Sequence, residues 1–154
     1  MLEHQCETGI VEVWLDIRGY EGFYQVSSFG RIKSLARNRK GKKGCQVPML
    51  EMIMKATRKK DNGRTKPYEE IKLRKNEDRN VKSKSYLVHR LVADAFIKQL
   101  EGDEQVDHIN GIHYDNRAEN LRIMKRIEHA RIHPKIVNPN PRDKVTGQYT
   151  KEIA

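Results

Sequence analysis

The sequence predicts an α+β fold, in which short antiparallel strands precede a compact unit of two strands and one helix. Three observations support this prediction. Short alternating runs of apolar and polar residues, bounded by glycine and asparagine, recur in the first half of the chain. Residues 88–97 then change to the apolar spacing of an amphipathic helix. Finally, five of the six histidines lie between His89 and His133, which concentrates reactive side chains in the second half.

The first strands are expected soon after a short N-terminal stretch. Residues 1–12 show no clear period, so we expect a loose terminus there. Glycine-containing turns then separate two predicted strands, at residues 23–27 and 31–35. Trp14 and Tyr20 are large aromatic residues beside these strands. We expect both to pack as a small core beneath the hairpin.

The N-terminal region as a whole, residues 13–87, is predicted to be basic and rich in β-hairpins. Residues 37–44 (RNRKGKKG) show no period, which indicates a flexible loop. Residues 49–60 fit either a short helix or an irregular arm. Residues 68–74 and 81–88 predict two strands joined by a polar turn.

A change of period marks the start of the second region, residues 88–133. The apolar residues of its first ten positions fall at i, i+3, i+4, i+7 and i+8, which predicts an amphipathic helix. His89 lies off the apolar stripe of this helix, and we expect a structural role for it. Residues 134–154 hold three of the five prolines and few apolar residues, so an extended tail is expected.

The positive charge is concentrated in the N-terminal region. The chain has a net charge of +10, and residues 31–84 hold 19 Lys or Arg against 6 Asp or Glu, a local charge of +13. A segment that carries more than the whole net charge indicates a polyanionic partner. The cations lie among alternating runs, not on one helix face, which favours nucleic acid over a membrane. The candidate DNA contacts are Arg31, Lys33, Arg37, Arg39, Lys40, Lys42, Lys43, Arg58, Lys59 and Lys60.

Other classes of protein are excluded by what the sequence lacks. No apolar run approaches the roughly 20 residues of a membrane span, and the N-terminus has no signal-peptide pattern. The two cysteines, Cys6 and Cys45, lack the spacing of a metal finger or a disulfide framework. We therefore expect a cytoplasmic protein with reduced thiols and no membrane partner.

Residues 106–133 (VDHINGIHYDNRAENLRIMKRIEHARIH) predict a strand, a polar loop, a return strand and a helix. The first strand is expected to end near Asp107, and the second to occupy residues 120–123. The helix is expected to run from Met124 to His133. Its buried face is expected to consist of Ile123, Ile127 and Ala130.

The polar residues of this unit suit a metal-dependent hydrolase. His129 and His133 are four residues apart, so they lie on one side of the predicted helix. The fold can bring Asp107 beside His129, and a carboxylate with an imidazole suits a divalent metal. His108 would then be available as a base. A metal and a base on a basic surface indicate phosphodiester hydrolysis. His113, within the loop, is expected to face solvent.

Three segments of the chain resemble parts of a known family. Residues 106–132 resemble the HNH nuclease motif of the ββα-metal type, and residues 88–97 resemble the helix that precedes it in phage members. Residues 13–35 resemble the nuclease-associated modular domain often fused in front. Together they resemble the free-standing and intron-encoded HNH homing endonucleases of bacteriophages. The motif positions are Asp107, His108, Asn116, Asn120, Leu121 and His129.

The resemblance implies a role for each motif residue. Asp107 would be a metal ligand, His108 the general base, and Asn120 the residue that orients the loop carrying His108. His129 would be the second ligand, where phage homing members usually have Asn. The spacing of His129 and His133 resembles the bacteriocin HNH nucleases, in which both helical histidines contribute, so His133 is a further candidate. The expected ion is Mg²⁺ or Mn²⁺, with Ni²⁺ or Zn²⁺ as the alternative.

The same resemblance implies double-stranded DNA as the partner, in a bacterial host cytoplasm. A single HNH site cuts one strand, so a monomer would nick, and a double-strand break would need a dimer or two sequential nicks. The chain ends about where a helix-turn-helix module would begin in homing members, so recognition would rest on the hairpins and on residues 37–60. Two alternatives stay open: a DNA-binding module whose nuclease site has lapsed, and an HNH accessory protein of phage DNA packaging with a terminase partner.

Overall fold

The structure, a computed structural model, describes residues 11–41, 44–58, 68–74 and 82–133. The expected loose terminus up to residue 10, the polar turn before residue 81 and the tail at 134–154 lie outside the described residues. The N-terminal strands are β1 (Trp14–Asp16), β2 (Tyr24–Ser27), β3 (Ile32–Ser34), β4 (Arg37–Lys40), β5 (Gln46–Met49), β6 (Met52–Met54), β7 (Thr57–Arg58), β8 (Glu69–Leu73) and β9 (Lys84–Leu87). They are followed by α1 (Val88–Phe96), β10 (Glu104–His108), the 3₁₀ turn η2 (Ala118–Asn120), β11 (Leu121–Lys125) and α2 (Arg126–Ile132).

The predicted α+β fold is confirmed, and its first layer is the antiparallel sheet β1-β2-β3-β6. The strands expected at 23–27 and 31–35 form β2 and β3, whose inward residues Val26 and Ile32 are buried. Tyr20 is buried as predicted. Trp14 is only half-buried, because its ring lies at the sheet surface under the ammonium of Lys33, 4.4 Å from the ring centroid.

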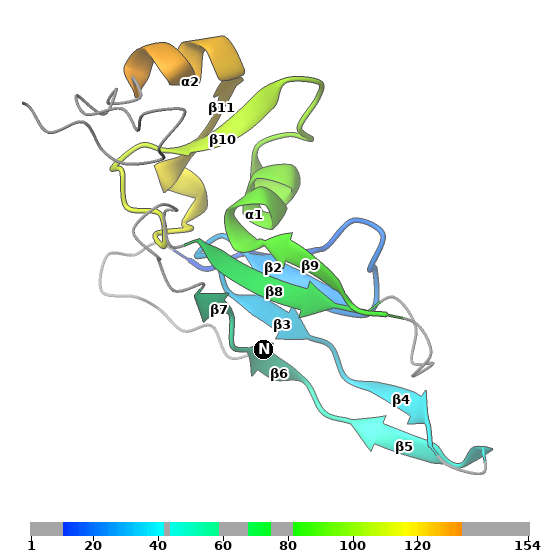
Figure 1. The fold of residues 1–154 in the computed structure, drawn as a ribbon. Coiled ribbons are helices and arrows are strands. Elements are labelled where there is room, and N and C mark those ends of the chain that lie inside the picture. The colour runs from blue at the N-terminus through cyan, green and yellow to red at the C-terminus, as the bar shows by residue number, and fades with distance from the viewer. Residues whose placement is uncertain (1–10, 42–43, 59–67, 75–81, 134–154) are drawn as a thin grey trace, which may run out of the picture.

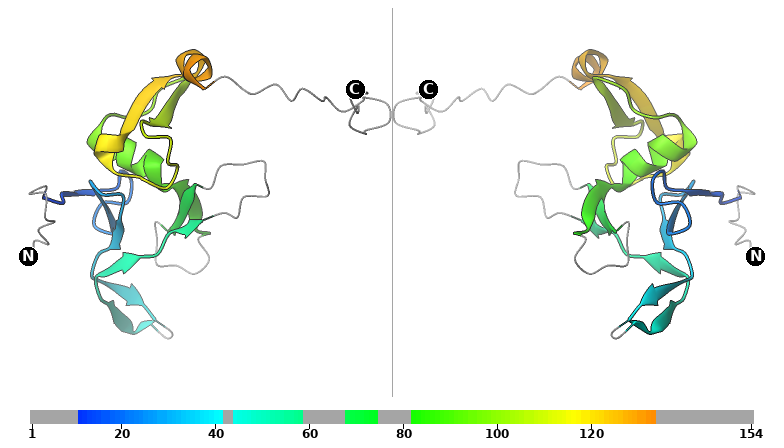
Figure 2. Two further views of the ribbon diagram at one scale, coloured as in Figure 1. Left: turned by 90° about the vertical axis from the view of Figure 1, so that its left-hand side faces the viewer. Right: turned by 90° about the vertical axis from the view of Figure 1, so that its right-hand side faces the viewer.

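Two N-terminal predictions are wrong. Residues 37–41 are not loop but begin a hairpin in which β4 pairs with β5. Residues 49–58 are neither helix nor irregular, because β6 extends the first sheet beside β3 and β7 joins β8. Strands β4 and β5 lie outside the core, so backbone pairing holds them, and β4 (RNRK) has no apolar residue to signal a strand. Figure 1 shows the β4–β5 hairpin projecting from the body, and Figure 2 shows it at the opposite end from α2.

The second layer is the antiparallel sheet β7-β8-β9, which contains both strands predicted at 68–74 and 81–88. Ile71 and Leu73 are buried on either side of the exposed Lys72. β9 runs directly into α1, which confirms the helix predicted at residues 88–97.

Helix α1 holds the two halves of the molecule together. It contacts β2, β8 and β9 on one side and β10 and β11 on the other (Figure 1). Val88 and Val92 of α1 share one apolar cluster with Val26 of β2, Leu73 of β8 and Leu121 of β11. Burying each such side chain contributes about 1.5–3 kcal/mol, so this shared core fixes the C-terminal unit against the sheets.

The C-terminal unit is the hairpin β10–β11 followed by α2. Pairing continues to Lys125, opposite Glu104, so the helix begins at Arg126 and not at Met124 as predicted. The predicted buried face is also wrong: no residue of α2 is buried, and Ile127 is 59% exposed. The helix packs on the thin β10–β11 ribbon, which is too narrow to cover an apolar stripe. None of the described helices is long and apolar enough to cross a membrane.

Candidate metal centre and nuclease site

Asp107 and the two helical histidines come together at one place. Asp107 lies near the end of β10, His129 lies on α2, and His133 is the residue that caps the C-terminus of α2. The Oδ1 atom of Asp107 is 3.1 Å from Nε2 of His133 and 3.7 Å from Nε2 of His129. One ligand atom from each of the three residues lies within 4.8 Å of the others. One carboxylate oxygen and two imidazole nitrogens are a donor set that suits a divalent transition metal, so the residues present fit such an ion.

Arg122 fixes the orientation of the Asp107 carboxylate. Its Nε and Nη2 atoms donate hydrogen bonds of 2.9 and 2.7 Å to Oδ2 of Asp107, which leaves Oδ1 facing the histidines. Burial alone would raise the pKa of Asp107, but this hydrogen bond and the charges of His133, Arg122 and His129 lower it. Arg122 was missed in the sequence, although it lies directly opposite Asp107 across the β10–β11 ladder.

His108 belongs to a second cluster beside the first. Because β10 stays regular to its end, Asp107 and His108 project from opposite faces of the strand. The His108 ring lies 5.2 Å from His89, 5.5 Å from His113 and 6.2 Å from Tyr68, measured between ring centroids. The prediction that His113 faces solvent is wrong, because this residue is half-buried and packs on Tyr68.

Tyr68 belongs to the second cluster, where its ring packs against His89, His108 and His113, and sequence reasoning missed it. It immediately precedes β8, so only the packing of the N-terminal sheets against the hairpin brings it here. Burial raises the pKa of Tyr68, and the negative charge of Asp107 raises it further. The phenol therefore stays protonated and can donate a hydrogen bond in this region.

His89 is buried in the second cluster. Burial lowers its pKa to about 3, with smaller contributions from the charges of His108, Arg90 and His113. Its Nδ1 atom is buried and has no hydrogen-bond partner among the described residues. At neutral pH the imidazole of His89 is therefore uncharged and buried within the second cluster.

This neutrality predicts a pH dependence of stability. An unfolded His89 binds a proton below its ordinary pKa of about 6.5, whereas the folded state does not until pH approaches 3, so folding loses stability as pH falls below about 6.5. Between pH 7 and pH 5 we expect wild type to lose about 2 kcal/mol more than His89→Gln, which cannot titrate. Urea unfolding of both proteins at each pH measures this difference. Equal losses in the two proteins would contradict the burial of a neutral His89.

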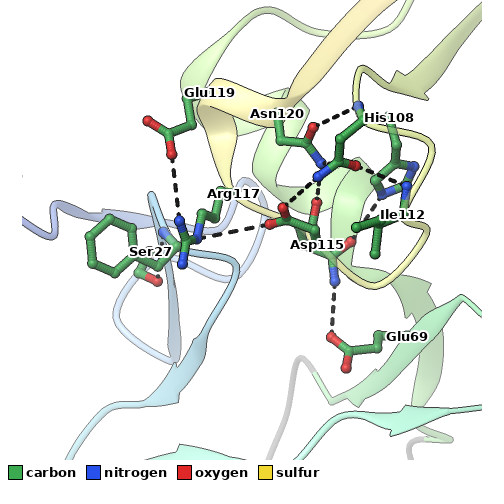
Figure 3. A network of polar contacts seen from close by, with 11 residues as sticks. Ser27, Glu69, His108, Ile112, Asp115, Arg117, Glu119 and Asn120 are labelled. Carbon is green, nitrogen blue, oxygen red and sulfur yellow. Dashed lines mark hydrogen bonds and ion pairs between the residues drawn. The ribbon is translucent and has the colours of Figure 1, made fainter.

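Asn120 ties together the loop between β10 and β11. Its Oδ1 accepts a hydrogen bond from the backbone N–H of Asn110 at 3.0 Å. Its Nδ2 donates to the backbone oxygen of Asp115 at 2.8 Å and to Oδ1 of Asn110 at 3.0 Å. These bonds cross the loop that begins at His108 (Figure 3). The geometry is that expected of a loop-orienting residue.

A second buried amide links the loop to the N-terminal half. Nδ2 of Asn116 donates a 2.9 Å hydrogen bond to Oε2 of Glu69 on β8, and its Oδ1 lies 3.4 Å from Nε2 of His108 (Figure 3). The other oxygen of Glu69 accepts a 3.0 Å bond from Nε of Arg58 on β7. Glu69 was missed because nothing in its local sequence distinguishes it from an ordinary strand glutamate.

The candidate DNA contacts other than Arg37 separate into three groups. The first group consists of Arg31 directly before β3, Lys33 on β3 and Arg58 on β7, which pair with Glu12, Glu51 and Glu69, respectively. Arg39 lies half-buried on β4. Lys42, Lys43, Lys59, Lys60 and the side chain of Lys40 lie outside the described residues.

Arg37 has a different environment from the one predicted. Its Nη1 atom donates to the backbone oxygens of Phe23 and Leu35 and to Oγ of Ser34, at 3.0 to 3.2 Å. Its guanidinium also lies over the Tyr24 ring, 5.2 Å from the centroid. These bonds turn Nη1 toward the protein at the base of the β4–β5 hairpin, and a DNA contact of Arg37 stays a prediction.

Basic residues also surround a cavity beside Glu69. The cavity has a volume of about 680 Å³ and lies between β3, β6, β7 and β8. Arg31, Lys55 and Arg58 contribute cations to its wall. This surface is adjacent to the Asn116 link and thus to the imidazole cluster.

Two antiparallel strands and a helix, with a carboxylate and two imidazoles gathered between them, define the ββα-metal class of nuclease fold. Comparison with known proteins agrees: residues 12–82 match the NUMOD4 motif, and residues 86–131 match the family of HNH endonucleases. The chain therefore carries a NUMOD4 motif in front of an HNH endonuclease domain. The resemblance drawn from the sequence is confirmed.

A curated relative and a solved structure are similar to this chain. The DNA endonuclease I-HmuI of Bacillus phage SP01 is 37% identical over 109 residues, which are 71% of this chain and 50% of that protein. A structure that describes DNA binding and cleavage by the HNH homing endonuclease I-HmuI matches with a TM-score of 0.55 and 29% identity. That match covers 82% of this chain and 62% of the other. This chain thus spans about half the length of its curated relative. HNH nucleases use a divalent metal, for which Asp107, His129 and His133 are the candidate ligands.

Proposed function

We propose that this chain is a metal-dependent DNA endonuclease of the homing type, which hydrolyses phosphodiester bonds in double-stranded DNA. The observation that carries this proposal is the cluster of Asp107, His129 and His133 beside His108, in a chain that carries an HNH endonuclease domain. The similarity to a phage DNA endonuclease supports the substrate class, and a bacterial host cytoplasm is the compartment we propose.

The metal would be held by Asp107, His129 and His133. A bound divalent ion supplies Lewis-acid stabilisation of charge on the phosphate and on the departing oxygen. Arg122 keeps one oxygen of Asp107 occupied, so Oδ1 is the oxygen that faces the site. Two imidazoles beside one carboxylate extend the range of accepted ions from Mg²⁺ and Mn²⁺ toward Ni²⁺ and Zn²⁺.

His108 would accept the proton of the attacking water. A neutral imidazole has one nitrogen with a lone pair that can take up this proton. Asn120 holds the loop that follows His108, and the ring of Tyr68 packs beside that of His108. The cations around the cavity beside Glu69 would contact DNA phosphates, which position the duplex without reading its sequence. One site per chain would nick one strand, and a double-strand break would need a homodimer or two sequential nicks.

Plasmid cleavage tests the proposal directly. Purified protein is incubated with supercoiled plasmids, including one with the target of the phage relative, in Mg²⁺, Mn²⁺, Ni²⁺ or Zn²⁺ and with a chelator. Metal-dependent conversion to open circles is expected. Binding of DNA without cleavage in any metal would contradict the proposal and indicate a lapsed module. Cleavage seen only with a terminase present would instead indicate a role in packaging.

The two helical histidines give a separate prediction about metal affinity. If both are ligands, His129→Ala and His133→Ala should each weaken binding of Ni²⁺ and Mn²⁺ by at least about 10- to 100-fold. Isothermal titration calorimetry measures the affinities, with His113→Ala as the control histidine outside the donor cluster. Unchanged affinity in His133→Ala would reduce the site to Asp107 and His129.

A further inference from the structure

We propose that Glu69 and Asn116 are positioning residues that fix the tautomer and the orientation of His108, so that a strand of the NUMOD4 motif sets the geometry of the HNH base. This inference rests on the proposed nuclease function, and it deepens that function by naming how the two parts of the chain cooperate. Asn116 and His108 are each only 3% exposed, so the contact between their side chains is protected from water.

The direction of the Asn116 amide follows from its partner. Both oxygens of Glu69 accept hydrogen bonds, one from Arg58 and one from Asn116. A carboxylate offers no proton, so the NH₂ group of Asn116 must face Glu69. The amide oxygen consequently faces Nε2 of His108, at 3.4 Å. Reversing the amide would set its NH₂ group against the imidazole and its oxygen against a carboxylate.

The amide in turn selects one tautomer of His108. An oxygen can only accept, so a neutral imidazole satisfies it when the proton is on Nε2. Nδ1 is then the nitrogen with a lone pair that can take a proton from water. A histidine whose proton is on the wrong nitrogen is inactive as a base, even when the ring occupies the correct place.

The backbone around Asn116 is held by the N-terminal sheet as well. The N–H of Ala118 donates a 2.8 Å hydrogen bond to the carbonyl oxygen of Ser28, in the turn between β2 and β3. Gly30 in the same turn has φ of +80°, and a Cβ there would lie 2.7 Å from Cβ of Asn116. The turn therefore approaches the loop so closely that only glycine fits. This packing fixes where the amide stands, and Glu69 fixes which way it points.

The test compares three variants. Glu69→Ala removes the acceptor, Glu69→Gln keeps an oxygen that can accept from Asn116, and Glu70→Ala removes the neighbouring carboxylate from the opposite face of β8. Nitrogen-15 NMR of histidine-labelled, metal-free protein above pH 8 reports the tautomer of His108. Single-turnover plasmid cleavage at saturating DNA then reports the chemical step apart from any change in DNA affinity that follows the release of Arg58.

We expect wild type, Glu69→Gln and Glu70→Ala to hold His108 as the Nε2–H tautomer, with similar cleavage rates. Glu69→Ala should show a mixture of tautomers and a cleavage rate lower by about 10- to 100-fold, with DNA affinity changed far less. An Nδ1–H tautomer in wild type, or an unchanged tautomer and rate in Glu69→Ala, would overturn this inference. Failure of wild type to cleave would instead contradict the proposed function, and the NMR result would stand independently of it.

Discussion

Asp107→Ala is expected to abolish metal binding and to reduce DNA cleavage by about 10³-fold or more, to the level seen with a chelator. Asp107 provides the only carboxylate of the three-residue donor cluster in the described part of the chain, and its Oδ1 faces both histidines. Without it, two half-exposed imidazoles remain beside the cation of Arg122, which repels a second positive charge. Calorimetric titration with Mn²⁺ and Ni²⁺, together with plasmid cleavage, measures both effects.

Two further variants show whether the loss is specific. Asp103→Ala removes an aspartate just before β10 that is not in the donor cluster, and it should bind metal and cleave like wild type. Asp107→Asn keeps the shape of the side chain but removes its charge, so it should bind metal more weakly than wild type and more strongly than Asp107→Ala. Wild-type metal affinity in Asp107→Ala would remove this residue from the ligand set.

His108→Ala is expected to keep metal and DNA binding and to lose about 10²- to 10⁴-fold in the rate of cleavage, the usual contribution of a general base. The reason is geometric: His108 projects from the opposite face of β10 from Asp107, so its removal leaves the donor cluster intact. Single-turnover cleavage at saturating DNA and metal measures the rate. Added imidazole should restore part of it, because a free base can enter the space that the side chain vacates.

The burial of His108 suggests another explanation for a loss of cleavage in His108→Ala, and the single-turnover measurement distinguishes the two. A histidine that is 3% exposed could serve only the packing of the cluster around Tyr68 and His89. In that case His108→Ala would lower the free energy of unfolding, yet each folded molecule would still cleave at the wild-type rate. His113→Ala is the matched control, since it removes a neighbouring ring that has no proposed chemical role.

Much of this protein is determined by local sequence patterns. The strands around Val26, Ile32 and Ile71 and the helix at 88–96 were predictable, because alternation and helical spacing show directly which side chains meet the core. The grouping of Asp107, His129 and His133 was predictable for a similar reason: the two histidines are four residues apart, and a short hairpin returns the chain to Asp107. The β4–β5 hairpin was not predictable, since strands outside the core need no apolar pattern.

Only the tertiary structure determined that the site residues form two clusters and which residues from other elements contact them. Asp107 and His108 are adjacent in sequence, but the regularity of β10 to its last residue sends them into separate clusters. The packing of α1 between the sheets and the hairpin brings Glu69 to Asn116, 47 residues away along the chain. Such contacts depend on how whole elements pack, and a single sequence carries no local signal for them. The composition and motifs of the sequence therefore predicted the class of chemistry. The shared core around α1 determined which residues contact the His108 side chain.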